Sequence, residues 1–290
     1  MTARGRLLSG LVATVIALAG FATVGAPTAA AGSTGTLQYV ALGDSYAAGI
    51  GAPPYVSSSD GCLQSNKGYP ALLDPKGRID LQANATCPGA TTTYVRENLP
   101  SELNEDTRLV TLTVGGNDLG LFQVLAACTG GGTATQCQAA IQSVLLLLPA
   151  TCGAESELAA RLESLYAVVN AAAPNALIVV TGYPYLFELL PTDPDLAIKT
   201  QINAATTLLN CAIENAVIDA QTDDGVNIVY VDVTARFEGH GIGTLDDPFI
   251  NGLSAGLPEA FHPNAAGYRA YAKAISAAIR DALGRQKQLA

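Results

Sequence analysis

Apolar residues in this chain gather into short continuous runs, separated by longer segments with helical periodicity. The runs at residues 37–42, 78–83, 108–114, 176–181 and 226–231 predict five β-strands, the second with the weakest pattern. Runs of Val, Ile and Leu without polar alternation favour strands buried on both faces, as in a parallel sheet covered by helices.

Between the runs, apolar residues recur every three or four positions. This spacing predicts helices over 158–169, 198–220 and 268–279, with Asn264 or its neighbour as the N-cap of the last one. Strand–helix alternation predicts a three-layer α/β/α fold with a doubly wound, mostly parallel sheet of five strands.

Two segments interrupt this alternation. Residues 51–67 are rich in Gly, Pro and Ser, and residues 232–262 show little periodicity. Loops of this length in a compact domain are usually functional or disordered, and we expect these two to set the depth of any ligand pocket.

The N-terminus has the pattern of a secretory signal peptide. Arg4 and Arg6 precede an apolar run over 7–25, and small residues follow at 29–31. We therefore expect a signal peptide over 1–31, secretion, and a single mature domain over 32–290. A membrane anchor is the alternative, but Gly and Ala dilute the apolar run, so we expect no stable membrane insertion after cleavage.

The chain is acidic, with 25 Asp and Glu against 15 Lys and Arg and a formal charge of −10. Loss of Arg4 and Arg6 with the signal peptide would take the charge from −10 to −12, because no acid lies in residues 1–31. This balance argues against nucleic acid and anionic membrane surfaces as partners, and favours a soluble secreted protein, which we expect to be monomeric.

Six cysteines follow the predicted signal peptide, and an even number in an exported chain predicts three disulfides. They are Cys62, Cys87, Cys128, Cys137, Cys152 and Cys211. A zinc site is the competing interpretation. It is weak, because the chain has no Cys-x-x-Cys and only two histidines, His240 and His262, so we expect no metal.

Chemically useful residues follow four of the predicted strands. Ser45 follows the first, Gly89 the second and Asn117 the third, and the fifth leads through the long loop to His262. In a doubly wound sheet, ligands bind beyond the carboxyl ends of the strands. The sequence therefore predicts that these four residues share one edge of the sheet.

These residue types suit nucleophilic catalysis. A serine hydroxyl needs a base during attack, and histidine is the usual one near neutral pH. The tetrahedral intermediate needs hydrogen-bond donors, which the free N–H of Ser45 and the side chain of Asn117 can supply, while Gly89 lets backbone approach the substrate. Losing one such donor typically costs about 2.7–4 kcal/mol of transition-state stabilisation.

Four sequence blocks carry a resemblance: GDSYAAG at 43–49, CPGATT at 87–92, GGND at 115–118 and FHPNAAGY at 261–268. Because these four blocks occur in this order, the chain resembles the SGNH (GDSL-type) hydrolases, most closely their secreted, three-disulfide actinobacterial esterase and lipase branch. The resemblance implies a flavodoxin-like sheet, Ser45 as nucleophile, His262 as base, and an oxyanion hole from Ser45 N–H, Gly89 N–H and the Asn117 side chain. A Gly-x-Ser-x-Gly pattern occurs at 252–256, but it lies within the long segment of little periodicity and not directly after a predicted strand, where the elbow of an α/β-hydrolase would lie.

The resemblance also implies sequential disulfides, which cysteine counting alone does not select. The implied pairs are Cys62–Cys87, Cys128–Cys137 and Cys152–Cys211.

One position departs from the wider superfamily, which has an Asp three residues before the catalytic His, where this chain has Glu259. Glu259 is a candidate orienter of His262, accepting its Nδ1–H as the acid of a triad does. The alternative is a backbone carbonyl, as the resembling branch is known to use, and we lean slightly toward it.

Several nearby residues have a plainer interpretation. We expect His240 to be a loop histidine bonded to backbone rather than a second base, and Asp44 and Asp118 to bond turn backbone rather than transfer protons. Residues 183–187 suit either core packing or an acyl-binding wall. For Phe249, Ile250 and Phe261 the wall is slightly favoured, and for 145–148 a buried helix end rather than a lid.

Together these features predict a secreted serine ester hydrolase that cleaves small-molecule or lipid esters through an acyl-enzyme on Ser45, with His262 as general base and no cofactor. A polysaccharide deacetylase with the same residues is the alternative. A non-catalytic secreted binding protein is disfavoured, because a binding module does not need Ser45, Gly89, Asn117 and His262 together.

Overall fold

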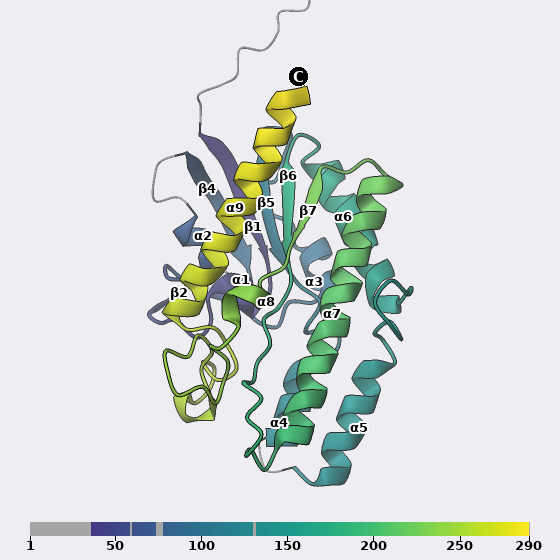
Figure 1. The fold of residues 1–290 in the computed structure, drawn as a ribbon. Helices are drawn as coiled ribbons and strands as arrows, with labels where there is room; N and C mark the ends of the chain where they lie inside the picture. The colour runs from purple at the N-terminus through teal and green to yellow at the C-terminus, as the bar shows by residue number, and fades with distance from the viewer. Residues whose placement is uncertain (1–35, 59, 74–77, 130–131, 290) are drawn as a thin grey trace, which may run out of the picture. The chain divides into compact units, whose positions relative to one another are not determined.

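The structure, a computed structural model, is built on five parallel strands in the order β4-β1-β5-β6-β7 (Figure 1). It describes residues 36–58, 60–73, 78–129 and 132–289, so the predicted signal peptide lies outside the described residues. The strands are β1 (Leu37–Gly43), β4 (Ile79–Thr86), β5 (Leu109–Thr113), β6 (Leu177–Thr181) and β7 (Ile228–Val231). Each overlaps a predicted run, and the predicted sheet is confirmed.

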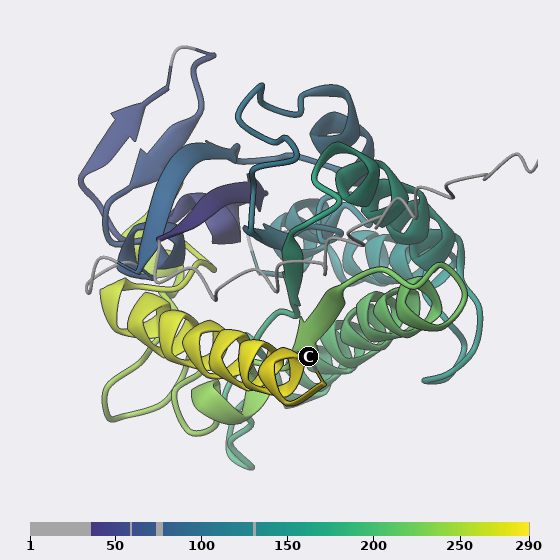
Figure 2. The same ribbon diagram turned by 90° about the horizontal axis from the view of Figure 1, so that it is seen from above.

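Helices cover both faces of the sheet, as Figure 2 shows from above. They are α1 (Ser45–Ala48), α2 (Tyr69–Leu72), α3 (Thr92–Glu97), α4 (Leu121–Thr129), α5 (Ala134–Leu145), α6 (Glu157–Ala172), α7 (Leu196–Thr222), α8 (Thr234–Phe237) and α9 (Ala265–Leu289), with a 3₁₀ turn at Leu253–Ala255. The predicted helices correspond to α6, α7 and α9. Asn264 caps α9, since its Oδ1 accepts from the N–H groups of Ala266 and Gly267.

The side chains of β1 show why the sheet needs two covering layers. Val40 and Leu42 are buried in a cluster with residues of α3, α6 and α7. Tyr39 and Ala41 are buried on the other face, in a cluster with residues of α2 and α9. Because successive strand residues point to opposite faces, an unbroken apolar run buries both sides and confirms the three-layer fold.

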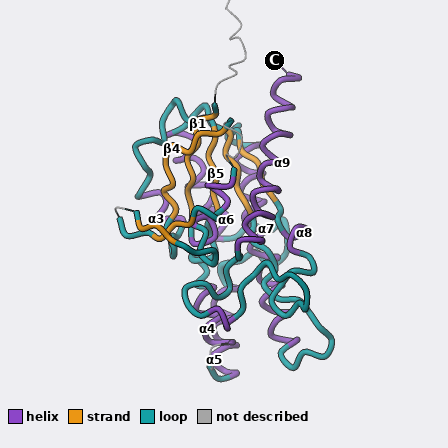
Figure 3. The backbone as a smooth tube through the Cα atoms, turned by 90° about the vertical axis from the view of Figure 1, so that its left-hand side faces the viewer, coloured by secondary structure: helices purple, strands orange, loops and turns teal. Residues whose placement is uncertain are grey.

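Two regions contain elements beyond those predicted. Residues 51–67 hold an antiparallel hairpin of β2 (Tyr55–Ser57) and β3 (Leu63–Ser65), attached to β4 because Gln64 Nε2 donates to the carbonyl of Asn84 at 2.6 Å. The helices α4 and α5 extend beyond the carboxyl ends of the strands, beside the first half of α7 (Figure 3). A capping box of Thr133 and Gln136, readable as T-x-x-Q, begins α5.

The predicted buried helix end at 145–148 is only partly right. Helix α5 ends at Leu145, and Leu148 is buried, but Leu146 is 85% exposed. Among the described residues, no helix is long and apolar enough to cross a membrane.

Three disulfides join the cysteines in the pairs that the resemblance implies. They are Cys62–Cys87, Cys128–Cys137 and Cys152–Cys211. The first ties the β2–β3 hairpin to the end of β4, the second ties α4 to α5, and the third ties the segment before α6 to α7.

Candidate active site

Ser45 lies where β1 leaves the sheet. Gly43 has a φ of +131°, and a Cβ there would lie 2.3 Å from the carbonyl oxygen of Thr113, so β1 and β5 approach each other more closely than a side chain permits. The next residue, Asp44, donates its N–H to the same carbonyl at 2.9 Å and accepts from Tyr46 N–H through Oδ1. This turn places Ser45 as the first residue of α1 at the carboxyl edge of the sheet.

His262 reaches Ser45 from the far end of the chain. Its Nε2 lies 2.8 Å from Ser45 Oγ, and its Nδ1 lies 2.9 Å from the carbonyl oxygen of Ala260. A carbonyl only accepts, so Nδ1 carries the hydrogen, and Nε2 presents its lone pair to the serine hydroxyl. The pair therefore has the tautomer that a general base needs.

The imidazole of His262 is largely withdrawn from water. Burial lowers its pKa to about 4, although bonds to the carbonyls of Ala260 and Pro258 and the charge of Glu259 act in the opposite direction. At neutral pH the ring is uncharged and able to accept a proton.

The loop before His262 is held by backbone contacts from several directions. Phe261 has a φ of +65°, and its carbonyl accepts from Tyr46 Oη at 2.6 Å, while its N–H donates to Asn251 O at 2.8 Å. A Cβ on Gly51 would lie 2.9 Å from His262 Cβ. The 51–57 segment thus packs directly against the histidine, and only glycine fits there.

Glu259 has a different partner from the one a triad requires. Its Oε1 accepts from Tyr55 Oη at 3.0 Å, and Tyr55 Oη in turn accepts from Gly51 N–H at 2.9 Å. Of the two orienters considered for His262, the structure places the Ala260 carbonyl at Nδ1. Glu259 instead joins the histidine loop to the segment that packs against it.

Gly89 and Asn117 follow β4 and β5, next to the Ser45 turn. Gly89 has a φ of +83°, and no atom lies within 4 Å of an added Cβ, so backbone conformation rather than crowding favours glycine here. Asn117 Nδ2 donates to Ala90 O at 3.0 Å, which fixes the amide while its second N–H stays available.

Asp118 holds these two strand ends together. Its carboxylate accepts from Thr92 N–H at 2.9 Å and Thr92 Oγ1 at 2.6 Å, at the start of α3. The expectation that it bonds backbone fits this contact, although the backbone belongs to the neighbouring turn and not to its own.

Tyr183, which the sequence placed in the 183–187 segment as core or acyl-binding wall, also contacts the Ser45 turn, and that contact was not predicted. Its Oη donates to Asp44 Oδ2 at 2.5 Å and accepts from Gly116 N–H at 3.2 Å. Burial raises the pKa of Asp44 to about 7, and the bond from Tyr183 opposes that rise. A tyrosine directly after a buried strand is a readable signal, because a buried hydroxyl needs a partner.

A mostly apolar groove opens beside Ser45 and His262, and we call it the Ser45 groove. Beyond residues of the Ser45, Asn117 and His262 turns, it is lined by Leu121, Phe122, Leu125, Tyr183, Pro184, Leu186, Thr206 and Phe261. Of the predicted wall, Tyr183, Pro184, Leu186 and Phe261 lie here. Ile250 is instead buried in the core, and Phe249 packs edge to face against Phe237, so the wall prediction was wrong for these two.

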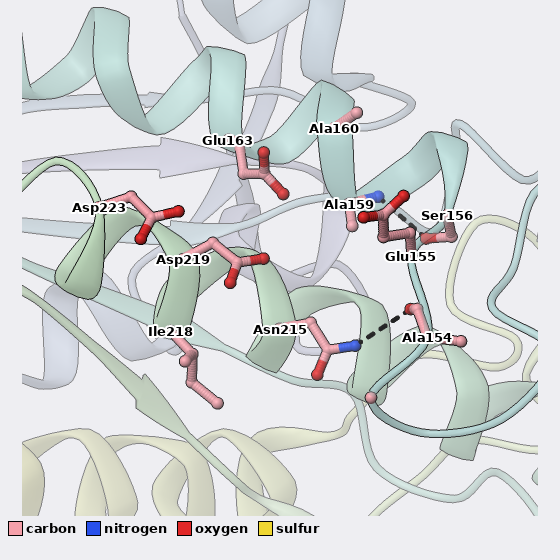
Figure 4. Close-up of a pocket in the computed structure, with 11 residues that line it drawn as sticks. Ala154, Glu155, Ser156, Ala159, Ala160, Glu163, Asn215, Ile218, Asp219 and Asp223 are labelled. Atoms are coloured by element: carbon pink, nitrogen blue, oxygen red, sulfur yellow. Dashed lines mark hydrogen bonds between the residues drawn. The ribbon is translucent and has the colours of Figure 1, made fainter.

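Two other features lie outside this groove. His240 Nδ1 is 2.8 Å from Asp247 O and its ring stacks on Phe249, as expected of a backbone-bonded loop histidine. A larger hollow of about 630 Å³ lies between α6 and α7, where Glu163 and Asp219 face each other (Figure 4). It shares no lining residue with the Ser45 groove, and its acidic walls do not suit an acyl chain.

A serine–histidine pair at the carboxyl edge of a flavodoxin-like sheet defines the class of SGNH-type hydrolases. The chain belongs to the GDSL-like lipase/acylhydrolase family, whose sequence model matches residues 41–270. Lipase 1 of Streptomyces coelicolor is 31% identical over 264 residues, which cover 90% of this chain and 93% of that protein.

Two solved structures are similar to the chain along most of its length. An extracellular lipase from Streptomyces rimosus has a TM-score of 0.72 at 30% identity, covering 83% of this chain and 99% of that one. Phospholipase A1 from Streptomyces albidoflavus NA297 has a TM-score of 0.72 at 34% identity with the same coverage. The predicted family, its actinobacterial branch and the ester hydrolase class are confirmed.

Proposed function

We propose that this chain is a secreted serine ester hydrolase that forms an acyl-enzyme on Ser45. As Ser45 Oγ attacks the ester carbonyl, His262 Nε2 takes its proton, and the tetrahedral intermediate collapses when His262 returns that proton to the leaving alcohol. His262 then removes a proton from water, the resulting hydroxide attacks the acyl-enzyme, and the acid leaves with Ser45 reprotonated.

The observation that carries this proposal is the two-sided contact of His262. Its Nε2 lies 2.8 Å from Ser45 Oγ while its Nδ1 lies 2.9 Å from Ala260 O. The oxyanion donors are Ser45 N–H, Gly89 N–H and the second Asn117 amide hydrogen. Each is worth about 2.7–4 kcal/mol in comparable sites.

The substrate is an ester with an apolar acyl group. Leu121, Leu125 and Leu186 line the groove beside the nucleophile and offer a sugar few hydrogen-bond partners. This lining, together with relatives named as lipases and a phospholipase, favours lipid esters over the acetylated polysaccharide of the alternative function.

The test is hydrolysis of p-nitrophenyl esters from acetate to palmitate, compared with Ser45→Ala and with intact-mass detection of a phosphonate adduct. We expect Ser45-dependent turnover and an adduct that Ser45→Ala cannot form. Absence of Ser45-dependent turnover at every chain length would falsify the proposal, and turnover confined to acetate would favour the deacetylase.

Secretion and a monomeric state belong to the same proposal. Three disulfides suit an oxidising compartment, and one chain supplies both Ser45 and His262. N-terminal sequencing of the exported protein should begin near residue 32, and light scattering should give the mass of one mature chain.

A further inference from the structure

A second, smaller cavity lies behind one wall of the Ser45 groove, and we call it the inner cavity. It is lined by Val124 of α4, Ile141 and Val144 of α5, and Gln201, Ile202 and Ala205 of α7, together with four residues that also line the Ser45 groove. Those four shared residues are Leu121, Leu125, Leu186 and Thr206. They form a single layer of side chains between the two spaces, and we call this layer the ridge.

The inner cavity is mostly apolar and narrow, and of its lining residues only Gln201 is exposed. Val124, Ile141 and Ile202 are each about 5% exposed, and Thr206 has its hydroxyl bonded to the carbonyl of Ile202. Apart from the exposed Gln201, a lining of this kind offers few partners for a water molecule. Its volume is about 20 Å³, against about 70 Å³ for the Ser45 groove, so it is a packing gap that side chains can enlarge by turning.

The helices around the inner cavity lie at the active end of the fold. In Figures 1 and 3, α4 and α5 extend beyond the carboxyl ends of the strands, the same edge to which Ser45 is delivered. Helix α4 is tied to α5 through Cys128–Cys137, so the two form one disulfide-linked wall facing α7. An acyl chain leaving Ser45 over Leu125 and Leu186 is therefore directed between this wall and α7.

We propose that the acyl chain of the substrate passes the ridge into the inner cavity, so that Ala205 and Ile141 set the acyl-chain length the enzyme prefers. This inference rests on the proposed function of Ser45. Each methylene buried there is worth about 0.8 kcal/mol, which corresponds to about fourfold in kcat/KM. The enzyme is then a medium- to long-chain hydrolase whose preference rises with chain length until the inner cavity is filled.

Ala205 and Ile141 are suitable test positions because they line only the inner cavity and not the Ser45 groove. Ala205→Leu should fill the space and lower the laurate-to-acetate ratio of kcat/KM about 15-fold, the effect of excluding two methylenes. Ile141→Ala should enlarge the space and raise the ratio about fourfold. Acetate turnover serves as the internal control, because a two-carbon acyl group does not reach either residue.

Ala274→Leu is the matched control, since Ala274 and Ala205 are both 8% exposed and Ala274 lies on α9. It should leave the chain-length ratio unchanged. The competing route runs along the surface past Phe122, which is 48% exposed at the groove. If Phe122→Ala changes the ratio while Ala205→Leu and Ile141→Ala leave it within twofold of wild type, the inference is overturned, although Ser45-dependent acetate turnover still upholds the proposed function.

Discussion

The role of Glu259 separates a catalytic dyad from a triad, and its replacement is the sharpest test of the site. Glu259 Oε1 is bonded to Tyr55 Oη at 3.0 Å, whereas the Ala260 carbonyl occupies Nδ1 of His262 at 2.9 Å. Glu259→Gln keeps the size of the side chain and removes its charge. We expect kcat to fall by less than about tenfold, because the tautomer of His262 is set by a backbone atom.

The alternative predicts a far larger effect. Where a carboxylate orients the histidine, replacing it with an amide costs roughly 10⁴-fold in kcat, or about 5.4 kcal/mol. The bond seen here joins two loops instead, and a partly exposed, charge-assisted bond of this kind contributes about 1 kcal/mol to folding. Because the amide oxygen of Gln still accepts from Tyr55, Glu259→Gln should lower the free energy of unfolding by less than about 1 kcal/mol.

Tyr55→Phe is the matched variant, because it abolishes the bond to Glu259 and leaves the carboxylate in place. Both variants and their combination should be compared by kcat/KM on a p-nitrophenyl ester and by urea denaturation. We expect non-additive losses of stability, the larger one from Tyr55→Phe, because it also leaves Gly51 N–H without its acceptor. A loss of 10³-fold or more in kcat for Glu259→Gln, with Tyr55→Phe near wild type, would refute the carbonyl-oriented dyad.

Three further results follow from the same contacts. Burial lowers the pKa of His262 to about 4, and only the neutral ring accepts a proton. The value of kcat/KM should therefore stay near its maximum at pH 5.5 and fall as the pH is lowered through about 4. A midpoint of the pH profile near 6.5 would contradict this expectation. Tyr183→Phe removes the donor to Asp44 Oδ2 and the acceptor of Gly116 N–H, and it should cost about 1–3 kcal/mol of unfolding free energy. Tyr185→Phe, at an exposed hydroxyl, should cost less than about 0.5 kcal/mol. Burial and neighbouring acids raise the pKa of Glu163, so the folded protein holds this proton more tightly than the unfolded chain does and loses stability as pH rises. Glu163→Gln should therefore raise Tm at pH 7 but not at pH 4. Glu97→Gln, at an exposed position, should not show this difference.

The strand pattern was sufficient to predict the sheet and the positions of the site residues. A parallel strand buried on both faces produces an unbroken apolar run, and the end of that run is also the edge of the sheet. Ser45 and Asn117 could therefore be assigned to one edge before any contact was known. His262 could be assigned to the same edge only by following the long loop that separates it from β7.

The rest of the site depends on contacts that local sequence does not encode. Tyr183 and Asp44 are 139 positions apart, and Tyr46 reaches Phe261 across 215 positions. Glu259 is bonded to Tyr55 and not to His262. Tyr55 lies in a Gly- and Pro-rich segment whose lack of periodicity gave no indication of its position in the fold. Helices α4 and α5 were not predicted for a different reason. A capping box is present at Thr133, but no clear apolar stripe follows it in the sequence.

The carbonyl orienter has a chemical consequence that concerns the whole loop. A carbonyl fixes the tautomer of His262 as well as a carboxylate does, but it contributes only a dipole when the imidazolium forms during attack. The opposing influences on the His262 pKa are the carbonyls of Ala260 and Pro258 and, after them, the charge of Glu259. Stabilisation of the imidazolium is thus shared among consecutive residues of one loop. We therefore expect the conformation of that loop, held by Tyr46, to matter more to catalysis than any single acid.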